Sequence, residues 1–180
     1  MIIKRDFIAT TIHEYLNENS KIENYLNNNF IEVERYTRSG RYGEFFAPKG
    51  EGYNGYGNIH VVRYIPKNSK ILVVNSSEDF LIKNKIELPL EIKNVIYKDT
   101  WKDAFDSMYS EDIDSRVNIP IDKYTEFIYR NAQLQVLKYS KGYDVIKFLY
   151  EDEVNPTQYW VLNKEILLTK EEIINKTKRL

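Results

Sequence analysis

The chain has 180 residues, of which 42% are hydrophobic and 29% charged, an ordinary composition for one folded domain. Its 26 basic and 27 acidic residues nearly cancel, so we expect no strong nucleic-acid footprint and no membrane partner. The absence of cysteine excludes disulfides and thiolate nucleophiles and fits a cytoplasmic location. The two histidines, His13 and His60, are far apart in the sequence, so no metal site is expected.

The N-terminal part is expected to pass from helix to strand. Apolar residues at three- and four-residue spacing predict a helix over 4–18. The asparagine-rich residues 17–29 favour caps and turns, which predicts a connector with one helical turn. A period-two pattern then predicts the first strand over about 30–37. We therefore expect an N-terminal helical segment, 1–29, followed by a single domain, 30–180.

Six of the seven glycines lie within residues 40–57, interleaved with aromatic rings. We expect a turn at 39–43, a very short strand at 44–48 and a loop at 49–57 whose glycines allow positive φ. The loop lacks the Lys-Ser/Thr pair of a phosphate-binding P-loop, and its glycines do not lead from a strand into a helix. Composition supports a flexible surface loop and a binding loop equally well.

Two strands are expected at 58–64 and 70–75, paired antiparallel across a proline-containing turn. Two more are expected near the C-terminus, at 143–150 and 157–163. Helix start and stop signals predict helices from Ser76 or Ser77, from Thr100 to Tyr109, from 121 to a stop at Gly142, and over the charged tail from 170. Short strands interrupted by helices predict an α+β fold rather than regular βαβ winding.

Five short motifs, taken in order, resemble the ADP-ribosyltransferase superfamily of bacterial toxins and poly(ADP-ribose) polymerases. The first-strand motif of that family is similar to ERY at 34–36, and its glycine-led aromatic strand is similar to GEFFA at 43–47. The later motifs are GYNGYGNIHVVRYIPKNSKILVV, GYDVIK and TQYWVLN. The resemblance spans about residues 30–168 and implies a split antiparallel sheet with flanking helices. FIATTIHEYLNEN also resembles leader helices that precede such domains in phage-encoded proteins, for which the host cytoplasm is the expected location.

The resemblance implies that NAD is the substrate and that an arginine on the first strand pairs with its pyrophosphate or ribose. Arg35 is the candidate, with Arg38 and Arg41 as substitutes. A surface ion pair of Arg35 with a neighbouring glutamate, Glu32 or Glu34, is an equally supported role.

The aromatic residues of the glycine-rich region are the candidates for stacking on nicotinamide. Phe45 and either Tyr53 or Tyr56 would sandwich the ring, whereas Phe46 is expected to be structural. Burial of the two tyrosines under the loop is an equally supported alternative. The cofactor-binding set implied by the resemblance is Arg35, Tyr36, Gly43, Phe45, Tyr53 and Tyr56.

Gln158 occupies the place of the catalytic glutamate of the family. Its amide can form the hydrogen bond to the ribose but supplies no negative charge. Glu151 and Glu153 lie just upstream; Glu153 is the candidate substitute, and a solvated turn is the alternative role. The fold would have to bring Arg35 and Gln158 together in a cleft, with the strand at 30–37 next to that at 158–163. His60, within a strand, is expected to be a packing or exposed residue rather than a general base.

Two functions follow from these residues. The first is an NAD-dependent mono-ADP-ribosyltransferase that acts on a protein or nucleic-acid acceptor, or an NAD glycohydrolase that uses water. The second is a catalytically inactive module of the same fold that binds NAD, another nucleotide or a partner protein, for example as a phage host-interaction protein. The identity of the acceptor does not follow from the sequence.

Overall fold

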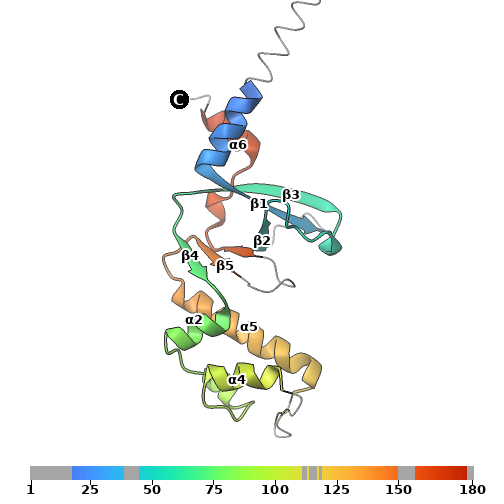
Figure 1. The fold of residues 1–180 in the computed structure, drawn as a ribbon, viewed down its shortest axis with the longest axis vertical. Coiled ribbons are helices and arrows are strands. Elements are labelled where there is room, and N and C mark those ends of the chain that lie inside the picture. The colour runs from blue at the N-terminus through green and yellow to red at the C-terminus, as the bar shows by residue number, and fades with distance from the viewer. Residues whose placement is uncertain are drawn as a thin grey trace, which may run out of the picture. The chain divides into compact units, whose positions relative to one another are not determined.

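The computed structural model describes residues 18–38, 45–110, 113, 117, 119–149 and 157–177. Within these ranges the chain forms an α+β fold with six strands, in mixed and mostly antiparallel pairing, and several helices (Figure 1). The predicted α+β class is therefore confirmed. The chain divides into two compact units, Met1–Lys70 with Tyr159–Leu180, and Ile71–Gln158. None of the described helices is long and apolar enough to cross a membrane.

The first unit contains four neighbouring strands in the order β3, β1, β2, β6. They are β1 (Phe30–Thr37), β2 (Phe45–Pro48), β3 (Ile59–Pro66) and β6 (Gln158–Val161), whose first residue, Gln158, is the last residue of the second unit. β1 and β3 pair antiparallel along their whole length, whereas β2 pairs with β1 through its last two residues and with β6 through its first two. The strands predicted at 30–37 and 44–48 are confirmed. The prediction that the first strand lies next to β6 is wrong, because β2 lies between them.

Alternation along these strands gives the sheet one apolar face. Val33, Phe46, Ile65, Tyr159 and Val161 are all buried, with exposed fractions of 5% or less. The paired registers place them on the same side of the four strands. The opposite face carries the polar and aromatic side chains described below.

Residues 18–29 form a helix that leads directly into β1, and α6 (Lys170–Thr177) lies beside it (Figure 1). Leu26, 2% exposed, packs with Ile173 of α6 and Tyr64 of β3. The connector predicted at 17–29 is therefore wrong, because burial of an apolar face outweighs the weak helix propensity of asparagine. The predicted tail helix is confirmed, whereas the helix predicted at 4–18 lies outside the described residues except for its last position.

The second unit contains β4 (Ile71–Val74) and β5 (Val145–Phe148), which pair in parallel from Ile71 opposite Val145 to Val74 opposite Phe148. The predicted antiparallel pairing of β4 with β3 is wrong. The turn itself forms, and Ser69 N–H donates to the carbonyl oxygen of Pro66 at 3.0 Å. β3 nevertheless pairs with β1, and β4 pairs with β5, and the local sequence does not predict these pairings.

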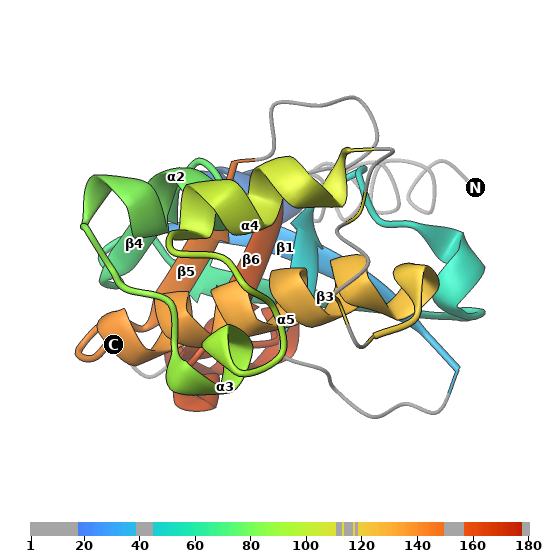
Figure 2. The same ribbon diagram turned by 90° about the horizontal axis from the view of Figure 1, so that it is seen from below.

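The described residues of the second unit also form four helices: α2 (Ser77–Lys83), α3 (Leu90–Lys93), α4 (Trp101–Met108) and α5 (Ile121–Tyr139). α2, α4 and α5 pack against one another (Figure 2), and their contacts bury Leu81, Trp101, Phe105, Tyr124 and Ile128. Ser76 and Thr100 cap α2 and α4 by accepting hydrogen bonds from the backbone three residues later. The three longer helices confirm the predictions, whereas the four-residue α3 was not predicted.

Candidate functional site

A buried carboxylate lies at the centre of a polar cluster in the first unit. Glu34, on β1, is 8% exposed. Its Oε1 accepts a hydrogen bond from the backbone N–H of Gly52 at 2.7 Å, and its Oε2 lies 3.0 Å from Nε2 of His60. Both carboxylate oxygens therefore have a partner, one from the glycine-rich loop and one from β3.

The register of β1 and β3 explains why these side chains meet. Tyr36 lies directly opposite His60, and Glu34, two residues before Tyr36 on β1, lies on the same face. The rings of Tyr36 and His60 are stacked, with centroids 4.6 Å apart and planes inclined by 17°. The His60 side chain is 43% exposed while that of Glu34 is 11% exposed, so the imidazole forms the accessible part of the cluster.

The glycine-rich loop is held to β1 through Glu34. Gly50 has a φ of +81°, in the left-handed region that favours glycine, which confirms positive φ in this loop. At Gly52, a Cβ atom would lie 2.7 Å from Oε1 of Glu34, so a side chain there displaces the carboxylate. Gly50 and Gly52 let the loop backbone approach the carboxylate of Glu34 closely. The amino-acid composition of the loop did not predict this role.

The electrostatics of the cluster favour an ionised Glu34. Burial raises the pKa of this carboxyl group, but hydrogen bonds from Gly52, His60 and Gly50 outweigh it and lower the pKa below its ordinary value. An ionised carboxylate accepts hydrogen bonds and donates none. His60 must therefore donate from Nε2, and in the neutral ring Nδ1 then carries the free lone pair.

The aromatic candidates of the loop region differ in their surroundings. Phe45 stacks on Trp160 of β6, with ring centroids 4.8 Å apart, so a ligand could reach only the other face of the ring. Tyr53 is 64% exposed, which excludes burial under the neighbouring loop. Tyr56 belongs to a short 3-10 helix, Asn54–Tyr56. Phe46 is 2% exposed, and its predicted structural role is confirmed.

The structure does not bring Arg35 and Gln158 together. Arg35 and Glu34 are adjacent on β1, so their side chains lie on opposite faces of the sheet. Glu34 pairs with Ala47, so Arg35 lies on the same face as Phe46, which pairs with Tyr159 of β6. Gln158 precedes Tyr159 in the same strand and lies on the other face. The expected convergence of the arginine and the glutamine is thus contradicted by the registers, because a one-residue offset reverses the face.

Some candidates lie outside the described residues, namely Arg41, Gly43, Glu151 and Glu153. Conversely, the sequence interpretation missed the pair of Glu34 and His60. Each residue lies within one of the motifs, but neither motif shows how the two strands pair. The β1–β3 register is the signal that reveals the pair. Among the described residues, no group of three or more His, Asp or Glu side chains is arranged to hold a metal ion.

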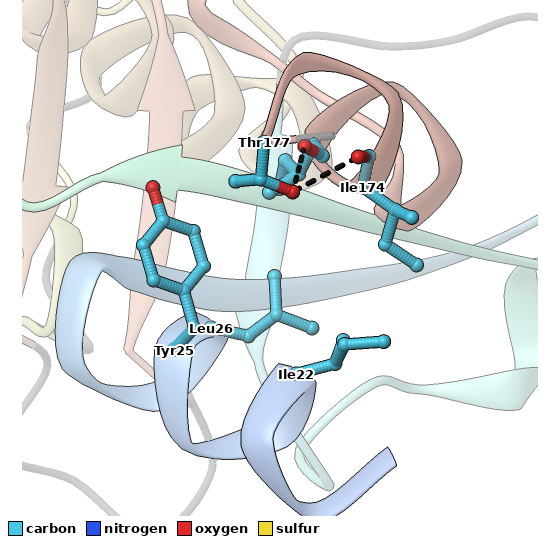
Figure 3. A pocket seen from close by; sticks show the side chains of 6 residues that line it. Ile22, Tyr25, Leu26, Ile174 and Thr177 are labelled. Carbon is cyan, nitrogen blue, oxygen red and sulfur yellow. Dashed lines mark hydrogen bonds between the residues drawn. The ribbon is translucent and has the colours of Figure 1, made fainter. Parts of the chain in front are cut away.

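A separate apolar pocket lies between the helix at 18–29 and α6 (Figure 3). Its lining consists of Ile22, Tyr25, Leu26, Ile173, Ile174 and Thr177. The hydroxyl of Thr177 donates to carbonyl oxygens of its own helix, at 3.2 Å to Ile173 and 2.9 Å to Ile174. None of the lining residues is charged, so this pocket lacks the groups that would fix a phosphate-bearing ligand.

Comparison with known proteins adds no assignment. No family model matches the chain, and neither a curated protein nor a solved structure matches it. The function is therefore inferred from the residues of this chain and their geometry.

Proposed function

We propose that this chain binds NAD on the polar face of the first unit and transfers ADP-ribose from it to a protein or nucleic-acid acceptor. The observation that carries the proposal is the strand order β3, β1, β2, β6. Four of the five motifs that resemble ADP-ribosyltransferases contribute these strands, although β6 is distant from the others in the sequence. Such an arrangement supports a common site for the motifs.

The registers support one face for this site. Tyr36 shares a face with Glu34 and Ala47, and Ala47 shares it with Phe45 two residues earlier. Phe45 is paired with Trp160, and Gln158 lies two residues before Trp160. Tyr36, Phe45 and Gln158 therefore face the same side, and Arg35 does not belong to the proposed site.

The proposed chemistry breaks the bond between nicotinamide and ribose through an oxocarbenium-like state, which depends on holding NAD and stabilising positive charge. The amide of Gln158 can hydrogen-bond a ribose hydroxyl but is neutral. The ionised carboxylate of Glu34 places a negative charge on the same face. Tyr36 and Phe45 supply rings for stacking on the nicotinamide.

The second candidate is a module of this fold that binds NAD, a nucleotide or a partner protein without chemistry. The placement of Arg35 and Gln158 on opposite faces of the sheet favours it, because a family-like pair of these residues does not form. The neutral side chain of Gln158 favours it as well.

Release of nicotinamide from NAD, measured by chromatography, separates the two candidates. We expect slow release by the wild type and faster release by Gln158→Glu, because a carboxylate adds charge beside the oxocarbenium ion. If Glu153 supplies that charge instead, the wild type is already active and Glu153→Gln lowers the rate by roughly 10²–10³-fold. Absence of nicotinamide from all three proteins would contradict the enzyme and leave the binding module.

A further inference from the structure

One group of the polar cluster, the imidazole of His60, has no role in the reaction proposed above. His60 is 43% exposed at its side chain, stacks on Tyr36, and donates through Nε2 to Glu34. No described residue gives Nδ1 of His60 a hydrogen-bond partner. An imidazole held by a carboxylate at one nitrogen, with a lone pair at the other, has the arrangement of a general base and its orienting acid.

We propose that His60 is the proton acceptor of this site and that Glu34 is the positioning residue that fixes its tautomer. This inference rests on the proposed NAD-dependent function and assigns an acceptor with an O–H group, either a hydroxyl or water. It reverses the sequence interpretation of His60 as a packing or exposed residue. The β1–β3 register supplies the reason, since it places the buried carboxylate and the imidazole on one face.

The step balances without a further reactant. The bond between ribose C1 and the nicotinamide nitrogen breaks, and its electron pair leaves with nicotinamide, which becomes neutral. The acceptor oxygen forms a new bond to C1, and its proton moves to Nδ1 of His60. The resulting imidazolium keeps its Nε2–H bond to Glu34, whose ionised carboxylate stabilises the charge. The proton then returns to solvent.

The variants that test this role keep the Glu34 contact wherever they can. In His60→Gln, the amide nitrogen can replace Nε2 as the donor to Glu34, but no basic nitrogen replaces Nδ1. His13→Gln is the matched control, because the chain has two histidines. In Glu34→Gln the charged orienting group is lost while the size of the side chain is kept.

The first measurement is the tautomer of His60 by ¹⁵N NMR, which is independent of NAD. We expect a protonated Nε2 and an unprotonated Nδ1 in the neutral ring of the wild type, and a mixture of tautomers in Glu34→Gln. A protonated Nδ1 and an unprotonated Nε2 in the wild type would overturn the inference, whatever the reaction rates are.

The second measurement is nicotinamide release by the same proteins. We expect His60→Gln to lower the rate by about 10²–10⁴-fold, and His13→Gln to leave it unchanged. Equal rates in the wild type and His60→Gln would overturn the role of His60 and leave the proposed function intact. If the wild type releases no nicotinamide, the proposed function is overturned, and with it the catalytic role of His60.

Discussion

The backbone N–H of Gly52 donates a hydrogen bond of 2.7 Å to the buried carboxylate of Glu34, and this contact joins the glycine-rich loop to β1. It explains why a loop rich in glycine lies next to a strand that carries a glutamate. A side chain at position 52 would collide with the carboxylate of Glu34. A residue without a carboxylate at position 34 would remove the acceptor of the Gly52 hydrogen bond. The loop and the acid therefore form one structural unit.

Gly52→Ala should destabilise the protein by about 1–3 kcal/mol, because the new Cβ would lie 2.7 Å from Oε1 of Glu34 and forces the carboxylate away. Urea unfolding of the wild type and the variant measures the difference in free energy. The control is the same substitution made in Glu34→Ala, where the colliding atom is absent. We expect the cost of Gly52→Ala to shrink in that background, and an unchanged cost would show that Glu34 is not its cause.

The ionisation of Glu34 should make stability fall in acid. The pKa of this carboxyl group is lower in the folded protein than its ordinary value of about 4.5, so folding releases a proton. The resulting stabilisation is complete above about pH 4.5 and is lost as the pH falls through the lower pKa of the folded state. Urea unfolding over a series of acidic pH values measures the slope.

Glu34→Gln should flatten this slope, because the amide does not titrate. Glu51→Gln, at an exposed residue of the same loop, is the matched control for the change of carboxylate to amide. Equal slopes for the wild type and Glu34→Gln would show that Glu34 does not contribute to the acid dependence.

Leu26→Ala should destabilise the protein by about 2–5 kcal/mol, because Leu26 is 2% exposed and packs with Tyr64 and Ile173. Thermal and urea unfolding measure this loss. Asn24→Ala, on the exposed side of the same helix, should have little effect. Similar stabilities for both variants would contradict the packing of this helix onto the first unit.

Local patterns predicted most elements of the fold. The β-rich run at Phe30–Thr37 gave a strand with the observed bounds, and Ser76 and Thr100 marked the starts of two helices. These features depend on side-chain alternation and capping groups, which lie within a few residues of each other. The helix at 18–29 was missed because its stability comes from burial of Leu26 by residues distant in the sequence.

Pairing between distant strands was the part that the sequence could not supply. The turn after Pro66 suggested a hairpin, yet β3 pairs with β1, and β4 pairs in parallel with β5. Because these pairings were not known, Arg35 was expected to lie close to Gln158, and the hydrogen bond between Glu34 and His60 was not predicted. A single residue of offset decides which face a side chain occupies, and that offset is known only once the registers are known.

Calorimetric titration with NAD tests the central claim, that NAD binds the face of the first unit that carries Tyr36. At millimolar NAD we expect heat of binding to the wild type. Tyr36→Leu should weaken the affinity by about tenfold, a loss of about 1.4 kcal/mol, because the stacking ring is removed. Arg35→Ala, on the other face, should bind as the wild type does. Absence of binding heat from the wild type, or a loss of affinity in Arg35→Ala with none in Tyr36→Leu, would contradict the account.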